Sequence, residues 1–315
     1  MQGMAERLQS QGLRVDIISK THCASARAGG KTCDHWVRKH IINGTCSADY
    51  VWIDEISQLD CELVAALNRL TYTSVKFLLS GDFNQFAPIG NSWRGAPVKE
   101  DAFETSRLLH RMAGGNLLVL TECKRSDSGL FDFYTRLIPG GDLFGCPVAE
   151  AVRQARERFT YEGICDLNLT LSHRERIEIN KRVNLHKKPE SAVFLPCPRV
   201  KRLSLNGPQS MWIWPGLELL GCVPMERHGI RNGVAYTVET VNETTVKLEG
   251  GIELSREDTV QMLRLSHAVT YSSVQGRETD GSLCLHCTGN AHMTLRHLYV
   301  ALSRARKAAL VRVSS

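Results

Sequence analysis

Short apolar runs alternate with helical patterns through the first 120 residues of the chain. Four short, mainly apolar runs have the length of buried parallel strands: residues 15–19, 50–53, 75–79 and 117–120. Between the second and third runs, Leu63, Leu67 and Leu70 recur at helical spacing, so we expect a helix that packs back on the sheet. Residues 1–12 are predicted to be a helix that Gly12 ends. Strands alternating with helices predict a parallel α/β sheet with right-handed crossovers.

The second half of the chain begins with the same pattern and then changes. Residues 169–171 are predicted to be a strand, and Ser172 caps a basic helix up to about residue 188. From 200 to 262, turn signals such as Pro215-Gly216 separate short alternating runs, which is typical of a small antiparallel barrel or meander. Strand–helix patterning resumes from Leu263.

A break rich in glycine and proline between residues 139 and 147 marks the predicted domain edge. We therefore predict a first domain at 1–145 and a second at 146–315, the second holding a β-rich insert at about 200–262.

Composition narrows the class of protein. The chain has 315 residues with 43% hydrophobic and 23% charged content, which suits a globular protein of about two domains. No apolar run is long enough to span a bilayer, and the first residues lack the features of a signal peptide, so we expect an intracellular protein with no membrane partner. The net charge of +6 permits nucleic-acid binding without requiring it.

The 11 cysteines are scattered and odd in number, which argues against a secreted disulfide framework. Cys284, His286, Cys287 and His292 form one cluster that could bind zinc. They fall in an alternating run without a second CxxC pair, so a buried strand is the favoured interpretation.

Two of the predicted strands end in polar residues. Asp54 and Glu55 follow the run at 50–53, and Gly81, Asp82 and Gln85 follow the run at 75–79. The carboxyl ends of parallel strands line the crevice in which open α/β sheets bind ligands. An adjacent Asp-Glu pair there suits nucleotide hydrolysis, because one carboxylate can hold Mg²⁺ while the other polarises water. An acidic helix N-cap is the structural alternative.

Seven short motifs follow one another in a fixed order. They are SKTH at 19–22, GGKT at 29–32, DE at 54–55, GDFNQFAP at 81–88, ECKRSD at 122–127, AVTYSSVQG at 268–276 and YVALSRA at 299–305. The ordered set resembles a superfamily-one DNA helicase of the RecD-like and Pif-like branch, and the resemblance covers nearly the whole chain.

The resemblance implies a fold and a set of partners. It implies two RecA-like P-loop NTPase domains, which are parallel sheets flanked by helices, with ATP between them and single-stranded DNA across their tops. A small SH3-like insert in the second domain would account for residues 200–262. The implied cofactors are ATP and Mg²⁺. The implied nucleic-acid partner is single-stranded DNA or a single-strand/duplex junction, bound by a monomer that moves 5′ to 3′.

The resemblance also implies roles around the first sheet. Asp54 would hold Mg²⁺ through water, Glu55 would be the general base, and Gln85 would sense the γ-phosphate and position water. Gly81 would allow a tight turn after its strand, and Asp82 would hold that turn.

In the second half, Arg125 and Arg304 would be arginine fingers, because guanidinium groups stay charged and present a planar fork to phosphate oxygens. A solvated arginine at a helix end is the alternative for Arg304. Gln275 and Gly276 would link the state of the nucleotide to the grip on DNA.

For DNA, the implied phosphate contacts are Thr21, His22, Thr270 and Ser273. Phe86 and Trp93 are candidates for base stacking, with core packing as an equal alternative. Trp212 and Trp214 are expected in the small core of the insert. The basic residues of the helix at 173–188 form a solvated face or a further DNA contact.

One motif departs from the pattern. The phosphate loop G-x-x-x-x-G-K-[ST] should open the first helix. The nearest match, residues 25–32, has Ser25 in place of the first glycine and ends only 22 positions (54 − 32) before Asp54. We therefore expect that residues 25–32 are not the phosphate loop and that the chain is truncated at its amino end before it. ATP affinity should then be severely reduced, with Lys31 the first substitute to test.

Three functions remain open on this sequence. The first is an ATP-dependent DNA helicase or translocase. The second is a non-catalytic nucleic-acid-binding remnant of such an enzyme. The third is an RNA helicase of the viral superfamily-one kind, against which the motifs at 268–276 and 303–305 favour DNA.

Overall fold

A computed structural model describes residues 2–27, 29–197, 207, 209–223 and 226–314. The chain divides into two compact units, Met1–Glu122 and Cys123–Ser315. The predicted boundary after residue 145 therefore lies inside the second unit. Asp127 holds this segment to the carboxyl-terminal residues, since its backbone N–H donates to the Arg306 carbonyl (2.9 Å) and its carboxylate accepts from the Ala308 N–H (2.8 Å). The α/β fold class is confirmed, with helices flanking parallel sheets.

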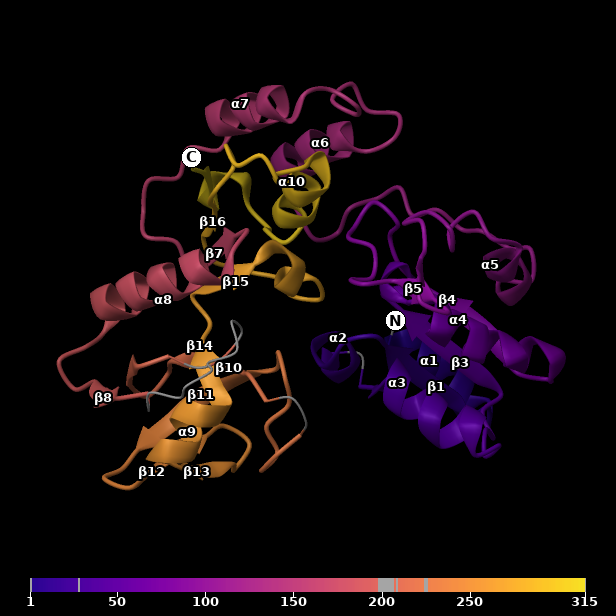
Figure 1. The fold of residues 1–315 in the computed structure, drawn as a ribbon, viewed down its shortest axis with the longest axis horizontal. Helices are drawn as coiled ribbons and strands as arrows, with labels where there is room; N and C mark the ends of the chain where they lie inside the picture. The colour runs from indigo at the N-terminus through magenta and orange to yellow at the C-terminus, as the bar shows by residue number, and fades with distance from the viewer. Residues whose placement is uncertain (1, 28, 198–206, 208, 224–225, 315) are drawn as a thin grey trace. The chain divides into compact units, whose positions relative to one another are not determined.

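The first unit is built on a parallel sheet in the order β2-β1-β3-β4 (Figure 1). Its strands are β1 (Val15–Ser19), β2 (Lys31–Thr32), β3 (Tyr50–Asp54) and β4 (Lys76–Leu79). Ile17 pairs with Trp52, and Trp52 pairs with Leu78, so the three longer strands are in register at their centres. The predictions of strands at 15–19, 50–53 and 75–79 are confirmed.

Helices cover this sheet with apolar side chains. Trp36 of α3 (Cys33–Trp36), Ile41 of the π-helix η1 (Val37–Ile42) and Leu63 and Leu67 of α4 (Cys61–Asn68) are buried in one cluster with Val51 and Ile53 of β3. Asp60 caps α4, because its carboxylate accepts from the Leu63 N–H at 2.9 Å. The predicted first helix is α1 (Gln2–Ser10), and Gly12 follows it with a φ of 80°.

The prediction of a strand at 117–120 is wrong. Leu117, Leu118, Val119 and Leu120 form no regular element and are 69% to 89% exposed. An apolar run becomes a strand only when a neighbouring strand pairs with it. The other elements of the unit are α2 (His22–Arg27), η2 (Ile56–Gln58), η3 (Arg69–Tyr72), β5 (Ser92–Trp93), β6 (Ala96–Pro97) and α5 (Arg107–Met112).

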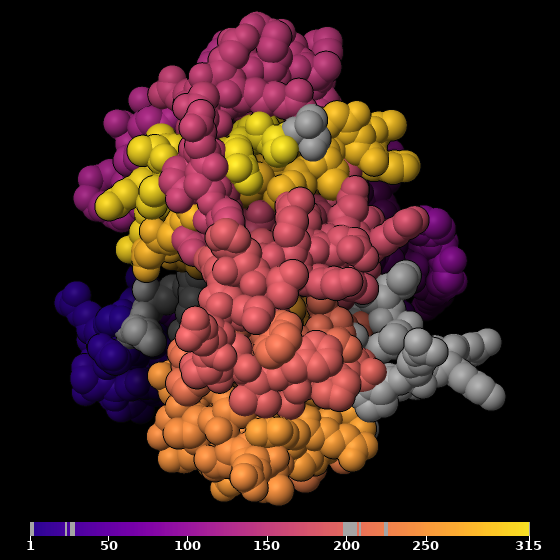
Figure 2. All heavy atoms as spheres, turned by 90° about the vertical axis from the view of Figure 1, so that its left-hand side faces the viewer, coloured from indigo at the N-terminus to yellow at the C-terminus, as the bar shows by residue number. Residues whose placement is uncertain are grey.

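The second unit holds another parallel sheet, in the order β15-β7-β16-β17. Its strands are β7 (Leu167–Thr170), β15 (Ala268–Thr270), β16 (Leu283–Leu285) and β17 (Val311–Val313). The long helix α8 (His173–Lys187) follows β7, and Ser172 caps it by accepting from the Glu175 N–H at 3.2 Å, as predicted. Figure 2 shows α8 along the face of this unit, between the orange antiparallel strands and the yellow carboxyl-terminal residues.

The β-rich insert is an antiparallel sheet in the order β13-β12-β11-β10-β14. Its strands are β10 (Glu218–Gly221), β11 (Ala235–Val241), β12 (Thr245–Leu248), β13 (Glu253–Ser255) and β14 (Leu263–Leu265). The buried side chains of this sheet form one hydrophobic core, which includes Leu219, Val238, Val246 and Leu263. Strand–helix patterning was predicted to resume at Leu263. Strand β14 still belongs to the antiparallel sheet, because it pairs with β10, and the parallel strands with their helices follow from β15 onward.

The remaining elements of the second unit complete its layers. They are α6 (Ser128–Tyr134), η4 (Thr135–Leu137), α7 (Val148–Arg158), β8 (Val193–Leu195), β9 (Met211–Ile213), α9 (Arg256–Met262), η5 (Tyr271–Val274), α10 (Leu295–Leu302) and η6 (Ala308–Leu310). Strands β8 and β9 pair antiparallel as a separate ribbon.

Two expectations about special sites are settled by the described residues. Cys284 lies within strand β16, and the residues that the structure describes contain no group of three or more His, Cys, Asp or Glu side chains able to hold a metal ion. The strand interpretation is therefore confirmed for Cys284 alone, because β16 ends at Leu285 and Cys287 has a φ of 62°. Within the same described ranges, every helix is too short or too polar to cross a membrane.

Candidate functional site

The carboxyl ends of β3 and β4 are joined by Ser80. Its hydroxyl donates to Asp54 Oδ1 at 2.9 Å and accepts from Trp52 Nε1 at 2.9 Å. Its backbone N–H donates to the Ile53 carbonyl (2.9 Å), and its own carbonyl accepts from the Ile56 N–H (3.0 Å). Ser80 thereby fixes the Asp54 carboxylate. The sequence analysis missed it, although a polar residue directly after an apolar strand was the available signal.

Glu55 occupies a left-handed backbone conformation, with φ 56° and ψ 50°. For a residue with a side chain this conformation costs free energy, so it persists only where the surroundings hold it. It turns the chain sharply out of β3 into η2. The residue with the strained backbone is therefore one of the two acidic residues that the sequence analysis selected.

Gly81 is required by a close neighbour. A Cβ at this position would lie 2.8 Å from the Ile56 backbone N and 3.0 Å from Ile56 Cγ1. The predicted reason was a tight turn, but the structure shows that the missing side chain makes room for the Glu55-Ile56 turn beside it.

Asp82 holds the loop after β4, as its predicted role requires. Its carboxylate accepts from the backbone N–H of Asn84 (2.9 Å) and from the side-chain amide of Asn84 (3.0 Å). Its carbonyl accepts from the Gln85 N–H at 3.2 Å. The loop that carries Gln85 is therefore tied to the end of β4, next to the strand that carries Asp54 and Glu55.

This arrangement suits a hydrated magnesium ion. Carboxylate oxygens are hard ligands, and Mg²⁺ is usually held by one or two carboxylates with several waters. Asp54 offers one carboxylate that the Ser80 hydroxyl orients. The residues present therefore fit Mg²⁺ held through water.

Lys20, directly after β1, is held by two carboxylates. Its Nζ lies 2.7 Å from Asp60 Oδ2 and 3.2 Å from Asp34 Oδ2. Burial opposes the charge, but the two acids outweigh it and raise the pKa of Lys20. The ion pairs tie the motif at 19–22 to α3 and α4. Thr21 then caps α2 by accepting from the Ala24 N–H at 3.2 Å, and His22 begins that helix.

The segment 25–32 does not have the architecture of a phosphate loop. The segment begins inside helix α2 instead of directly after a strand. Lys31 and Thr32 form β2, which pairs with Ile18 and Ser19 of β1. A Cβ on Gly30 would lie 2.2 Å from the Ile17 carbonyl oxygen, so this glycine allows close packing on β1.

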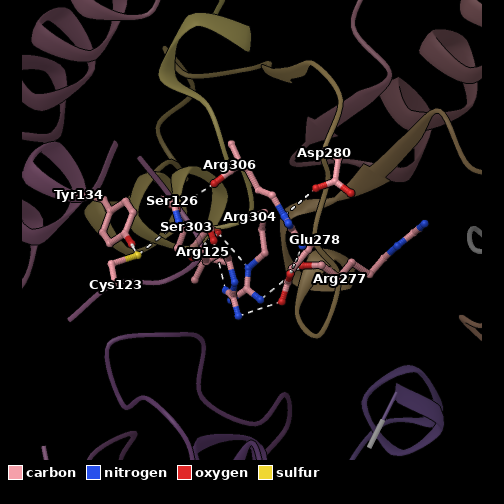
Figure 3. Close-up of polar contacts among 12 residues, drawn as sticks. Cys123, Arg125, Ser126, Tyr134, Arg277, Glu278, Asp280, Ser303, Arg304 and Arg306 are labelled. Carbon is pink, nitrogen blue, oxygen red and sulfur yellow. Dashed lines mark hydrogen bonds and ion pairs between the residues drawn. The ribbon is translucent and has the colours of Figure 1, made fainter. Parts of the chain in front are cut away.

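In the second unit, Arg125 lies in a network of charges that Figure 3 shows. Its Nη2 is 2.9 Å from Glu278 Oε1, and its Nη1 donates to the Ser303 carbonyl at 3.2 Å. Glu278 also faces Arg306 at 3.6 Å, and Arg306 pairs with Asp280 at 2.6 Å. Glu278 is a second residue that the sequence analysis missed, and no local pattern marked it.

Arg304 lies just after α10 and is only 1% exposed. Its Nε donates to the Val300 carbonyl at 3.2 Å and its Nη1 to the Arg277 carbonyl at 3.5 Å. The alternative of a solvated arginine at a helix end is therefore wrong. Arg304 and Arg125 both lie in the network around residues 277–278 and 303 (Figure 3).

Cys123 lies two positions before Arg125 and accepts several hydrogen bonds. Its Sγ is 3.3 Å from Tyr134 Oη and 3.3 Å from the Ser126 backbone N (Figure 3). Burial opposes the thiolate, but these donors outweigh it and lower the pKa of Cys123. Ser126 in turn donates to the Ala305 carbonyl at 2.8 Å, which fixes the segment that carries Arg125.

The motif at 268–276 runs from β15 through η5. Thr270 is buried, and its Oγ1 is 2.7 Å from the Oγ of exposed Ser273. Gln275 ends η5, and Gly276 has a φ of 76°, a conformation that favours glycine. Among the aromatic candidates of the first unit, Phe86 is half-buried and Trp93 on β5 is 43% exposed.

The basic residues of α8 lie in three different environments. Arg174, Lys181 and Arg182 are exposed, as a solvated face predicts. Arg176 is fully buried, so the prediction of a solvated side chain is wrong there. Lys187 pairs with Asp166 at 2.6 Å, and Lys188 lies 4.2 Å from the centre of the Trp212 ring. Trp214 packs against the core of the insert.

Comparison with known proteins identifies the fold. No family model and no curated protein matches the chain. Among solved structures, Pif1 helicase from Candida albicans matches with a TM-score of 0.65 and 18% identity, over 100% of this chain and 86% of that one. The chain has the fold of the Pif1 helicases.

Two further Pif1 structures match along nearly the whole chain. A structure concerned with DNA unwinding at forked duplex DNA by two coordinating Pif1 helicases has a TM-score of 0.65 and 14% identity, over 99% of this chain and 84% of that one. Bacteroides Pif1 in complex with ADP-AlF3 and single-stranded DNA has a TM-score of 0.62 and 15% identity, over 95% and 82%. The Pif1 fold has two RecA-like domains, which accounts for the parallel sheet in each unit.

Proposed function

We propose that this chain is the core of an ATP-dependent DNA helicase or translocase. The observation that carries the proposal is the arrangement at the ends of β3 and β4, where Ser80 orients Asp54 beside the strained Glu55. The Pif1 fold and an acidic pair at the end of a parallel strand together support a nucleotide-hydrolysing site.

Three residues of the first unit have separate roles in ATP hydrolysis. Asp54 would hold Mg²⁺ through water, and the ion would supply positive charge to the phosphate oxygens. Glu55 accepts the proton of the attacking water, and its left-handed backbone turns the chain out of β3 at this residue. Gln85, on the loop that Asp82 ties to β4, orients that water and contacts the γ-phosphate.

The residues of the second unit supply positive charge. Arg125 and Arg304 stabilise the charge that develops on the transferred phosphoryl group. Glu278 holds Arg125 at 2.9 Å, so the guanidinium is oriented before nucleotide arrives. Gln275 and Gly276 follow η5, which carries Ser273, and link the nucleotide to the grip on DNA.

For nucleic acid, Thr21, His22, Thr270 and Ser273 contact phosphates, and Phe86 supports a base. Such contacts hold a strand without reading its sequence. The net charge of +6 favours association with a polyanion.

A second candidate, a non-catalytic nucleic-acid-binding protein, is favoured by one observation. Residues 29–32 enter β2, and no other part of the 315-residue sequence carries the phosphate-loop pattern. The enzyme and the binding protein differ in ATP turnover, which makes the two functions separable by experiment.

The test is ATP hydrolysis by the purified chain, alone and extended by the in-frame upstream coding sequence, with no nucleic acid, single-stranded DNA or single-stranded RNA. For the helicase we expect DNA-stimulated turnover in the extended chain that Glu55→Gln lowers by roughly 100-fold or more. Glu62→Gln, at an exposed glutamate of α4, is the matched control and should leave turnover unchanged.

Other results would favour other functions. DNA binding without turnover in both forms would make the binding protein the better conclusion. Stimulation by RNA alone would indicate an RNA helicase. DNA-stimulated turnover by residues 1–315 alone would direct attention to Lys31, tested by Lys31→Ala.

A further inference from the structure

Two aromatic side chains form a pair on the outer side of the β8–β9 ribbon. Phe194 of β8 lies opposite Trp212 of β9 in the antiparallel register, and the centres of their rings are 5.2 Å apart. Met211 and Ile213, on either side of Trp212, are buried in the core of the insert, so the alternation of a strand directs Trp212 to the other face. Phe194 is 47% exposed. Trp212 is half-buried outside that core, so the prediction that it fills the core of the insert is wrong.

The neighbouring helix α8 holds this pair in place. The Asn184 side chain donates to the Trp212 carbonyl (2.9 Å) and accepts from the Trp212 N–H (2.8 Å). The Nζ of Lys188 lies 4.2 Å from the centre of the Trp212 ring, a distance at which an ammonium group is attracted to the face of an indole. Lys188 therefore occupies one face of Trp212, and the more accessible ring of the pair is that of Phe194.

A line of positive side chains leads along α8 to the aromatic pair. Arg174, Lys181 and Lys188 follow one another at intervals of seven positions, which places them on one side of a helix. Arg174 and Lys181 are exposed, and Lys188 is half-buried just past the end of the helix. Among the described residues of α8, Glu178 is the exposed acid on this side, so positive charge is in excess. Figure 2 shows this helix on the surface of the second unit.

The aromatic pair lies far from the DNA contacts proposed above. Thr170, at the end of β7, pairs with Thr270 of β15, and α8 begins three positions later at His173. A helix of 15 residues is about 22 Å long, since each residue adds about 1.5 Å. Lys188 therefore lies at the opposite end of α8 from Thr270, and the line of cations joins the two places.

This combination of groups indicates a polyanion that carries planar rings. Proteins that bind single strands without sequence preference combine a basic surface, which follows the backbone, with aromatic side chains on which bases stack. The core of a protein–protein interface is instead depleted of charged residues. A cross-strand pair that only stabilises the ribbon would explain the contact between the two rings, but it would explain neither the exposed ring of Phe194 nor the cations beside it.

We propose that the outer side of α8 and the β8–β9 ribbon form a second binding site for single-stranded DNA, which we call the α8 platform. It consists of Arg174, Lys181, Lys188, Phe194 and Trp212. The cations contact phosphates, and a base stacks on Phe194. A strand held both there and near Thr270 dissociates slowly, because either contact can re-form while the other persists. The choice of DNA over RNA rests on the proposed function, whereas the site itself requires no ATP.

The first test measures binding by fluorescence anisotropy, without nucleotide, to a labelled oligothymidylate long enough to extend from Thr270 to Phe194. Phe194→Leu keeps an apolar side chain but removes the ring, so we expect the dissociation constant to rise roughly 5-fold or more. Phe194→Tyr keeps a ring and should bind like the parent, which separates stacking from a loss of folding. Phe144→Leu, at another exposed phenylalanine of the second unit, is the matched control and should also bind like the parent.

The dependence of binding on salt tests the cations. Each phosphate that a lysine neutralises on a single strand releases counterions, so Lys188→Gln should reduce the slope of log affinity against log salt by about 0.7. Lys307→Gln, at an exposed lysine outside the α8 platform, should keep the parent's slope. A merely structural role of Lys188 would change stability and leave this slope unaltered.

Cross-linking locates the bound strand. Single-stranded DNA that carries 5-iodouracil joins to aromatic side chains under light, and we expect cross-linked peptides that contain Phe194 or Trp212. Four results would overturn the proposal: parent-like binding by Phe194→Leu, equal losses in Phe194→Leu and Phe144→Leu, cross-links confined to the first unit and the motif at 268–276, or binding of RNA without binding of DNA. None of these measurements uses ATP turnover. An inactive protein can therefore still confirm the α8 platform, and an active helicase can still refute it.

Discussion

At the scale of single residues, Ser80 has two roles that one hydroxyl can perform. It accepts from the buried Trp52 indole and donates to Asp54, each at 2.9 Å. An indole N–H without an acceptor costs free energy when it is buried. The same hydroxyl therefore stabilises the fold and orients a carboxylate of the candidate site.

We expect Ser80→Ala to lower the free energy of unfolding by about 1–3 kcal/mol, because Trp52 loses its acceptor. Urea denaturation followed by tryptophan fluorescence measures the loss. Ser74→Ala, at an exposed serine just before β4, is the control and should unfold like the parent. If both variants match the parent, the Trp52–Ser80 contact contributes nothing to stability.

The buried His267 makes the stability of the protein depend on pH. It precedes β15 and is 8% exposed, and its Nε2 has no hydrogen-bond partner among the residues that the structure describes. Burial lowers the pKa of His267 to about 4, with a smaller contribution from Lys187, while Asp166 acts in the opposite direction. The folded protein therefore keeps this imidazole neutral at a pH where the unfolded chain protonates it.

The sign of the pH effect follows from that difference. Between the unfolded pKa of about 6.5 and the folded pKa of about 4, the unfolded chain binds the extra proton, so stability falls as the pH falls through this window. We expect a loss of up to about 3 kcal/mol that His267→Gln removes, measured by denaturation at pH 7 and pH 4.5. His292→Gln, at an exposed histidine, should keep the parent's pH slope; an unchanged slope in His267→Gln would refute the assignment.

At the scale of elements, two asparagine side chains of α8 hydrogen-bond to the backbone of neighbouring strands; we call this pair the polar clamp. Asn180 donates to the Ala268 carbonyl (2.9 Å) and accepts from the Ala268 N–H (2.8 Å), which completes the outer edge of β15. One turn later, Asn184 makes the same two bonds to Trp212 of β9, at 2.9 Å and 2.8 Å. Two asparagines four positions apart thus attach both the parallel sheet and the β8–β9 ribbon to one helix.

Replacing the first of these amides should be costly. Asn180→Ala leaves a buried N–H and a buried carbonyl of β15 without partners, and we expect a loss of about 2–4 kcal/mol in the free energy of unfolding. Chemical denaturation measures it against Lys181→Ala, an exposed neighbour on the same helix. Equal stability of the two variants would show that the clamp is not needed.

Elements differ in how well the sequence predicted them. Strands β1, β3 and β4 and helix α8 lie where the apolar pattern and the Ser172 cap placed them. The run at 117–120 is apolar throughout, whereas the run at 263–265 contains Arg264. The first is nevertheless exposed, and the second joins the antiparallel sheet. A strand exists only with its partner, and the partner is distant in sequence.

The candidate site shows the same division. Local patterns pointed to Asp54, Glu55, Gln85 and Arg125, because polar residues at strand ends and short motifs are visible in the sequence. The sequence analysis did not select Ser80 or Glu278, because their roles depend on contacts with distant residues. The fold brings Ser80 to Asp54 and Glu278 to Arg125.

At the scale of the whole molecule, the division into units predicts where proteases cut. The stretch from Gly114 to Glu122 is mostly exposed and has no helix or strand, whereas residues 123–145 are tied to the second unit by Asp127 and Ser126. Limited chymotrypsin digestion should cut first among Leu117, Leu118 and Leu120 and leave two resistant fragments, identified by mass. A variant with lysine at these three positions should lose that cut. A first cut between 139 and 147 would instead support the boundary predicted from the glycine and proline pattern.

The sequence by itself determined the α/β class, the strands that carry the acidic pair and the order of the motifs, because apolar periodicity and strand-end chemistry are local properties. Tertiary structure decided the rest: the unit boundary, the order of the strands in each sheet, the burial of Arg304 and Arg176, and the contacts of Ser80 and Glu278. Ser80 reaches Asp54 across 26 positions, and Arg125 reaches Ser303 across 178. Such contacts depend on how strands pair and helices pack, and the free energy that selects them is shared among residues far apart in the chain.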